Sequence, residues 1–223
     1  MSGLSWTVLV PIKRLDLAKS RLRGALAGVD HGDLVLAMTM DTVSAALACP
    51  VVGRVVAVTS DGAVAAAVTV LGADVVPDGP DAGLNPALAY AATVARSKAS
   101  AGAQPGLAAL AGDLPALRPA DLAEALRAAA DATALRTPVR RYVADTAGTG
   151  TVLLAAPPGA SLEPCFGPDS AAAHKASGAV QLDGYWPSLR RDVDTAADLA
   201  GAHALGLGAY TARVHTAFTG SGA

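Results

Sequence analysis

Three aspartates occupy positions at which an α/β protein would bind a metal ion or a phosphate. Asp113 follows the unbroken apolar run at residues 107–111 and lies between Gly112 and Pro115. Such a run is typical of a strand buried in a parallel sheet, and open α/β sheets bind ligands at the carboxyl edge of their strands. Asp113 is therefore expected at a ligand-binding edge, with a simple turn-forming role beside the proline as the alternative.

The other two aspartates, Asp192 and Asp194, lie two residues apart at the end of a predicted strand, residues 189–193. On extended backbone such side chains point to the same face. Three neighbouring carboxylates repel one another unless a cation lies between them. Mg²⁺ fits, because it binds carboxylate oxygens and completes its shell with water and substrate phosphates. The alternative is that Asp194 and Thr195 only cap the next helix and that Asp192 is a surface acid.

A basic segment follows the first predicted strand. Residues 12–23 carry five Lys or Arg side chains and one acid. Placed after a strand, such side chains can bind phosphates, Lys as a point charge and Arg as a two-pronged donor. The segment is neither a Walker A loop nor a G-x-G-x-x-G turn, since no glycine precedes Gly24 in it. By charge alone, the solvated face of a first helix is the simpler interpretation.

A second possible anion site is Gly167-Pro168-Asp169-Ser170. Ser170 is predicted to cap a short helix, residues 171–177, whose free amides would attract an anion. Thr149 and Thr151 offer hydroxyl groups on the preceding loop, and His174 lies one turn beyond Ser170. A plain capping turn is the alternative. Together, the basic segment, the three acids and this second site indicate an enzyme that joins two phosphate-bearing molecules.

Alternating strands and helices are expected to hold these residues in place. The patterns predict strands over residues 6–10, 55–59, 74–77, 107–111, 139–144, 151–156, 180–182 and 189–193, and helices over 30–47, 63–70, 87–98, 119–129, 171–177 and 195–205. This alternation implies an α/β fold with a mostly parallel central sheet flanked by helices. Residues 1–218 are expected to form a single domain, followed by a disordered tail at 219–223.

Composition limits the classes of protein that fit. The chain has 223 residues, of which 52% are hydrophobic and 16% charged, so it can form a substantial core. Its net charge of -2 gives no reason to expect a nucleic-acid or membrane partner. No apolar run reaches about 18 residues, no secretory signal pattern is present, and Cys49 and Cys165 lack metal-ligand spacing. A cytoplasmic protein is expected.

Several segments occur in the same order in one enzyme family. They are Val10-Pro11-Ile12-Lys13-Arg14 with Ala18-Lys19-Ser20-Arg21-Leu22, Leu84-Asn85, Gly112-Asp113-Leu114-Pro115, Gly148-Thr149-Gly150-Thr151, Phe166-Gly167-Pro168-Asp169-Ser170 and Asp192-Val193-Asp194-Thr195. They resemble the guanylyltransferases of coenzyme F-420 (deazaflavin) biosynthesis, which condense GTP with 2-phospholactate or phosphoenolpyruvate. The resemblance implies a single-domain, nucleotidyltransferase-like (Rossmann-like) fold.

The resemblance also implies roles for individual residues. Magnesium is expected at Asp113, Asp192 and Asp194, and acceptor contacts at Thr151, Gly167 and Ser170. From their position after the first strand, Lys13 and Lys19 are assigned to the triphosphate, with Lys19 also counted as catalytic, and Asn85, at the start of a helix, is assigned to guanosine. The wider fold family usually carries a glycine-rich first loop, where this chain has Pro11-Ile12-Lys13.

The predicted reaction is transfer of GMP from GTP to the phosphate of phosphoenolpyruvate, with release of pyrophosphate. Its partners are thus GTP and a small phosphorylated carboxylate. The preference for phosphoenolpyruvate over 2-phospho-L-lactate rests only on the alanine-rich composition. Two different functions also fit the residues: a nucleotidyltransferase with a sugar phosphate or molybdopterin acceptor, and a non-catalytic GTP-binding module.

Overall fold

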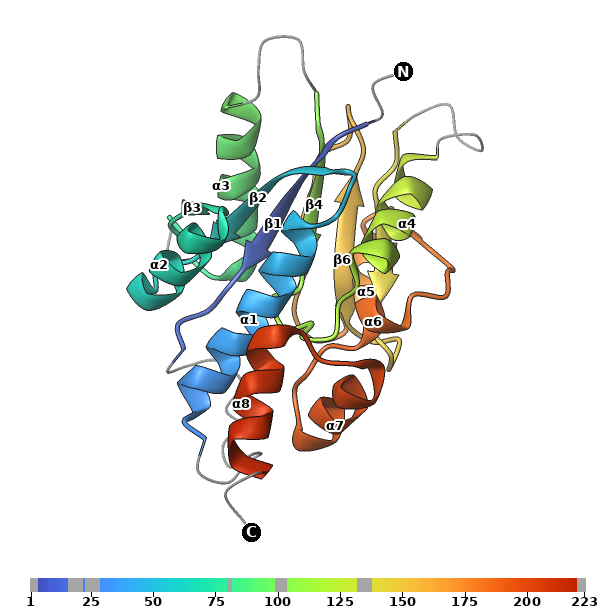
Figure 1. Ribbon diagram of the computed structural model, residues 1–223. Helices are drawn as coiled ribbons and strands as arrows, with labels where there is room; N and C mark the ends of the chain where they lie inside the picture. The colour runs from blue at the N-terminus through green and yellow to red at the C-terminus, as the bar shows by residue number, and fades with distance from the viewer. Residues whose placement is uncertain are drawn as a thin grey trace.

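A seven-stranded sheet crosses the molecule and carries helices on both faces (Figure 1). The computed structural model describes residues 4–15, 22, 29–79, 82–98, 104–131 and 138–219. The strands are β1 (Trp6–Pro11), β2 (Val52–Val58), β3 (Asp74–Val76), β4 (Gly106–Leu110), β5 (Arg141–Ala144), β6 (Thr151–Ala156) and β7 (Val180–Gln181). The helices are α1 (His31–Leu47), α2 (Gly62–Leu71), α3 (Leu84–Ser97), α4 (Pro119–Ala130), α5 (Ser170–Ala176), α6 (Pro187–Arg190), α7 (Ala196–Leu205) and α8 (Ala209–Thr219).

The strand order is β3-β2-β1-β4-β6-β5-β7, and among these strands only β6 runs antiparallel to its neighbours. The loop between β5 and β6, residues 145–150, explains the reversal. Parallel neighbours need a crossover of a dozen residues or more, whereas a loop this short can only join antiparallel strands. The predicted mostly parallel α/β sheet is therefore confirmed.

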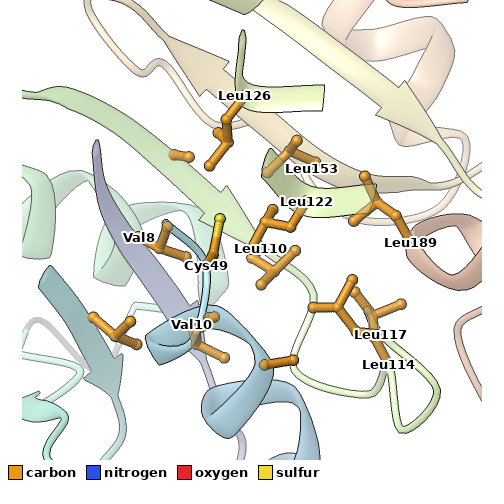
Figure 2. Packing of buried hydrophobic residues seen from close by; sticks show 14 of the residues in the cluster. Val8, Val10, Cys49, Leu110, Leu114, Leu117, Leu122, Leu126, Leu153 and Leu189 are labelled. Carbon is orange, nitrogen blue, oxygen red and sulfur yellow. The ribbon is translucent and has the colours of Figure 1, made fainter. Parts of the chain in front are cut away.

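The central strands are buried on both faces, which is why their sequences are predominantly apolar. In β1, Val8 and Val10 pack into a cluster that includes residues of α1, α2 and α4, whereas Leu9 packs into a cluster with residues of α3 and α5. Figure 2 shows the first of these layers, with Leu122 and Leu126 of α4 near Leu110 and Leu153 of the sheet. Successive side chains of a strand point to opposite faces, so both layers need apolar residues.

The predicted strand at residues 189–193 is wrong. Residues Pro187–Arg190 form the short helix α6, and no strand follows it before α7. Proline fits the first turn of a helix, and Asp121 of α4 accepts hydrogen bonds from the backbone N–H and the hydroxyl of Ser188 (3.1 and 2.7 Å). The carboxylate that stabilises this helix start is thus supplied by a distant element.

Two further boundaries differ from the predictions. The helix α3 begins at Leu84, so Pro86 lies in its first turn, where the missing N–H costs no hydrogen bond. The helix α8, which the sequence did not predict, lies alongside α1 (Figure 1) and includes Thr219, so the predicted tail can begin only at residue 220. Residues 220–223 lie outside the described residues. None of the helices in the described ranges is both long and apolar enough to span a bilayer.

Candidate active site

The strands β1 and β4 are parallel neighbours in the sheet, and a glycine just beyond β4 allows their carboxyl ends to approach closely. A Cβ atom built on Gly112 would lie 3.1 Å from the carbonyl oxygen of Pro11 and 3.5 Å from a methyl carbon of Val10. That first contact is tighter than backbone atoms ordinarily allow, so a glycine lets the chain leave β4 close to the end of β1. Asp113 and the start of the basic segment therefore meet at the same edge of the sheet, the edge at which α/β proteins bind ligands.

The turn that carries Asp113 is fixed from the neighbouring helix. The backbone N–H of Leu114 donates to the hydroxyl oxygen of Thr42 on α1 (2.9 Å), and that hydroxyl donates to the carbonyl oxygen of Met38 (2.9 Å). Thr42 and Leu114 are both fully buried. The position of Asp113 is therefore set by a hydrogen-bond chain within the core rather than by the loop alone.

The second acidic segment reaches the same place through the backbone. Val193 donates its N–H to the carbonyl oxygen of Asp113 (3.1 Å), and its side chain is buried in a cluster with Leu199. Asp192 and Asp194 flank this residue, and both are more exposed than it is. The structure thus joins the segment of Asp192 and Asp194 to the backbone of Asp113, but from a loop and not from the strand end that the sequence suggested.

The donor set suits a magnesium ion that is shared with a substrate. Among the described residues, no group of three or more His, Cys, Asp or Glu side chains is arranged to hold a metal by itself. Mg²⁺ usually takes one or two protein carboxylates and completes its shell with water and substrate phosphates. One or two of the carboxylates of Asp113, Asp192 and Asp194, together with substrate phosphates, would make that type of site, and metal binding by all three stays a prediction.

The start of the basic segment is fixed at the same edge. Leu15 donates its N–H to Asp61 (3.1 Å), a carboxylate that also caps α2 by accepting from Ala63 and Val64. The bond from Leu15 is the main reason that the pKa of Asp61 lies below its ordinary value. Lys13, within this held stretch, is exposed. Lys19 lies outside the described residues.

A short loop presents Thr151 at the start of β6. Asp145 accepts hydrogen bonds from the backbone N–H groups of Thr149 (3.0 Å) and Gly150 (2.9 Å). A Cβ atom on Gly150 would collide with the same carboxylate. Thr151 is largely buried, at 8% exposure. The loop with the predicted acceptor-binding hydroxyls is therefore held by its own aspartate.

Asn85 holds the segment that leads into α5. Its side-chain oxygen accepts from the N–H of Phe166 (2.8 Å) and its amide donates to the carbonyl oxygen of the same residue (2.9 Å). The contact of Asn85 with guanosine stays a prediction. The structure shows a different use of the side chain, which orders the backbone next to Gly167.

Ser170 is not the N-cap of α5, contrary to the prediction. Asp169 occupies that position in a left-handed conformation (φ 53°) and makes no side-chain cap bond. Ser170 is the first helical residue, its N–H donates to the carbonyl oxygen of Gly167 (3.2 Å), and its side chain is buried. The N–H of Ser170 is therefore already bonded within the tight turn at residues 167–170. The helix begins one residue earlier than expected.

The start of α5 and the Thr151 loop are nevertheless neighbours. Ala171 donates its N–H to the carbonyl oxygen of Thr149 (3.0 Å), and His174 lies within hydrogen-bond distance of Thr151 (3.0 Å). The structure therefore brings the segments of Thr151 and Ser170 together, as their joint assignment to the acceptor required. The spacing of His174 from Ser170 is visible in the sequence, but its contact with Thr151 is not.

Comparison with known proteins points to one family. Residues 6–211 match a family model described as "Guanylyl transferase CofC like". The phosphoenolpyruvate guanylyltransferase of Salinispora arenicola (strain CNS-205) is 60% identical over 207 residues, which cover 93% of this chain and 92% of the relative. The protein of the same name from Geodermatophilus obscurus is 52% identical over 213 residues, covering 93% of each chain.

Solved structures support the fold. The structure of CMP:2-keto-3-deoxy-manno-octonic acid synthetase complexed with CTP is similar with a TM-score of 0.53 and 18% identity, covering 90% of this chain and 98% of that one. A nucleotidyl transferase from Methanothermobacter thermautotroptrophicus (Mth528) gives 0.52 and 17%, covering 98% and 99%. At such low identity the likeness shows a shared nucleotidyltransferase-type fold.

Proposed function

The chain belongs to the family of CofC-like guanylyl transferases, and from this premise we propose that it transfers GMP from GTP to the phosphate of phosphoenolpyruvate. The observation that carries the choice of acceptor is the 60% identity, over 93% of the chain, to a relative named for that reaction. The family model spans residues 6–211 as one unit, which supports a single domain. A cytoplasmic location accords with two phosphorylated metabolites as substrates.

The reaction is a direct displacement at phosphorus. A phosphate oxygen of phosphoenolpyruvate attacks the α-phosphorus of GTP, a new P–O bond forms, and the bond to the bridging oxygen breaks with pyrophosphate leaving. The second pKa of a phosphate monoester is about 6, so the attacking oxygen is already largely anionic at neutral pH and needs no general base. The protein must instead bring two anions together and align them in line.

We assign the nucleotide side of the reaction to the edge formed by β1 and β4. Asp113, Asp192 and Asp194 would hold Mg²⁺, and Lys13 and Lys19 would neutralise the triphosphate. When bound, Mg²⁺ supplies positive charge to the phosphates and to the departing pyrophosphate. The close approach of β1 to the Asp113 turn, and the bond from Val193 to Asp113, support this assignment.

We assign the acceptor side to the loop at Thr151 and to the turn at Gly167 and Ser170. Hydroxyl donors suit the phosphate and carboxylate oxygens of phosphoenolpyruvate. Both segments are held by hydrogen bonds within the protein, from Asp145 and from Asn85. Such preorganisation lowers the entropic cost of binding a small ligand that carries two anionic groups.

One assay tests the proposal. Purified protein is incubated with GTP, Mg²⁺ and either phosphoenolpyruvate or 2-phospho-L-lactate, and pyrophosphate release and product mass are measured. We expect a product in which GMP is joined through a diphosphate (P–O–P) linkage to the phosphate of phosphoenolpyruvate. A higher kcat/KM with 2-phospho-L-lactate would reassign the acceptor, and turnover with only a sugar phosphate would place the chain with another reaction. Nucleotide binding without turnover for any acceptor would overturn the proposal.

A further inference from the structure

His174 on α5 is buried and is bonded to two separate segments of the proposed acceptor site. Its side chain is 0% exposed. One ring nitrogen, Nδ1, lies 3.0 Å from Oγ1 of Thr151, and the other, Nε2, lies 2.9 Å from the backbone nitrogen of Cys165. The ring also packs edge-on against Phe166 and tilted against Tyr142, with centroid distances of 5.0 and 6.0 Å.

These contacts determine which nitrogen carries the proton. A backbone N–H can only donate, so Nε2 of His174 must accept from Cys165 and must be unprotonated. The neutral ring then carries its proton on Nδ1, which lies 3.0 Å from Oγ1 of Thr151, and the ring is also hydrogen-bonded to the backbone of Ser170. A protonated Nδ1 has no lone pair to accept with, so toward Thr151 it can only donate. Burial is the main cause that lowers the pKa of His174 to about 4. The hydrogen bond with the backbone of Ser170 acts against this shift, and the charge of Arg140 adds to it. The ring is therefore neutral at physiological pH.

The tautomer in turn sets the role of the Thr151 hydroxyl. A hydroxyl group has one proton to donate, and here its oxygen accepts from His174. In the described part of the chain that hydroxyl has no protein acceptor for its own proton. Because the N–H of His174 occupies one side of the oxygen, the hydroxyl proton must point elsewhere, and it is available to an anionic ligand.

We propose that His174 is a positioning residue for the acceptor, because it fixes the Thr151 hydroxyl as a hydrogen-bond donor to an anionic oxygen of the phosphorylated carboxylate. The inference rests on the proposed function. By accepting from Cys165, the same ring also holds the backbone two residues before Gly167. One neutral imidazole thus ties together the two segments that are assigned to the acceptor.

Two substitutions separate the two bonds of the ring. In His174→Asn the side-chain amide can occupy the place of Nδ1 and still donate to Thr151. In His174→Gln the longer side chain can reach the place of Nε2 and accept from Cys165, but it loses the bond to Thr151. We expect His174→Gln to raise the KM for phosphoenolpyruvate about tenfold, and His174→Asn to raise it much less, with the KM for GTP nearly unchanged in both.

A packing control and a double variant make the test specific. Tyr142 packs against the His174 ring, and its hydroxyl donates to Gln181 and not to His174. Tyr142→Phe removes only this hydroxyl, so it should leave the acceptor KM unchanged. Thr151→Val removes the hydroxyl through which His174 acts, so adding His174→Gln to it should raise the acceptor KM no further, whereas Thr151→Ser should keep a near-normal KM. Additive effects in the double variant, or equal effects of His174→Gln and Tyr142→Phe, would overturn the inference.

A spectroscopic measurement decides the question without catalysis. Nitrogen NMR of the wild-type protein labelled at histidine, with His174 assigned by its loss in His174→Asn, should show a protonated Nδ1 and an unprotonated Nε2. A proton on Nε2 would overturn the inference whatever the kinetics. If the wild type transfers GMP to no acceptor, the proposed function fails, and the tautomer still decides whether His174 orients Thr151.

Discussion

At the scale of single residues, the three aspartates depend on one backbone contact. Val193 donates to the carbonyl of Asp113, so the residues on either side of Val193 are carried to the end of β4. Their exposed and half-buried positions leave their carboxylates accessible to a nucleotide-bound cation. Charge, rather than packing, should therefore be what these residues contribute.

Asp113→Asn, Asp192→Asn and Asp194→Asn should each lower kcat/KM by roughly 100-fold or more, because an amide keeps the shape but binds Mg²⁺ weakly. Steady-state kinetics over a magnesium titration measure the effect, and thermal melts should stay within a few degrees of the wild type. Asp74→Asn is the matched control, since Asp74 pairs with Arg54 on the edge strand β3, which β2 and β1 separate from β4 and the Asp113 turn. Near-native turnover of two of the three variants at low magnesium would refute the metal assignment.

His174 should make the stability of the fold depend on pH. Its pKa falls from 6.5 to about 4 on folding, so between these values the unfolded chain binds a proton that the folded chain does not. The free energy of unfolding is therefore undiminished above about pH 6.5 and should fall by up to about 3 kcal/mol as the pH drops to about 4.

The measurement is chemical denaturation of the wild type and of His174→Asn between pH 7 and pH 4. As the pH falls, the wild type should lose more of its free energy of unfolding than the variant, because only the wild type carries the imidazole of His174. Tyr142→Phe keeps the imidazole and should follow the wild-type profile. A difference that stays constant over the whole range would mean that His174 does not titrate in this way.

At the scale of elements, the first N–H groups of α8 are bonded to a carboxylate from α1. Asp41 is buried and accepts from the backbone N–H groups of Tyr210 (3.0 Å) and Thr211 (2.8 Å). A Cβ atom on Gly208 would coincide with the carboxylate of Asp41. The carboxylate thus satisfies helix N–H groups that a local cap would otherwise serve. It also ties α8 to α1, against which α8 packs (Figure 1).

Asp41→Ala should lower the free energy of unfolding by about 2 kcal/mol, because two backbone N–H groups lose their buried acceptor. Gly208→Ala should also destabilise the fold, but clearly less when Asp41 is already alanine, since the added methyl group then has room. Asp33→Ala, at an exposed acid in the first turn of the same helix α1, should cost much less. Urea denaturation of the four variants and of the wild type gives these differences, and strictly additive effects would contradict the steric explanation.

At the scale of the whole molecule, the substrates should bind on the edge where the central strands end. At this edge α1, the Asp113 turn and the loop that carries Asp192 and Asp194 (the acidic loop) contact one another. Thr42 of α1 holds that turn, Val193 joins the acidic loop to it, and Asp61 holds the start of the basic segment. Ligand binding should therefore stabilise the fold as a unit.

GTP with Mg²⁺, at about 100 times its dissociation constant, should add about 2.7 kcal/mol of stability, which corresponds to roughly 5–10 °C in melting temperature. Addition of EDTA should remove most of this shift, since the phosphates then lose the ion that joins them to the carboxylates. Asp113→Asn should show little shift under the same conditions. An equal shift with and without EDTA would mean that the nucleotide binds without the metal.

The sequence by itself determined the elements whose stabilising residues are local. The uninterrupted apolar run of β4 predicts a strand buried on both faces, and the β-rich run of β1 predicts a strand that ends near Pro11; the structure confirms both. The caps of α1, α2 and α7 are supplied by Asp30, Asp61 and Thr195, each one residue before its helix. Because cap and helix are adjacent in the chain, the interaction can be recognised without knowing the fold.

Only the tertiary structure decided the features that depend on partners far along the chain. The hydrogen-bond acceptor at the start of α6 is Asp121, which lies 67 residues from Ser188. At the start of α8 it is Asp41, which lies 169 residues from Tyr210. No local sequence pattern therefore predicts either helix. The tautomer of His174 likewise follows from Cys165 and Thr151, which lie 9 and 23 residues away. A side chain's charge state, hydrogen-bond direction and burial depend on which distant groups folding places beside it, and the sequence lists those groups without stating which of them meet.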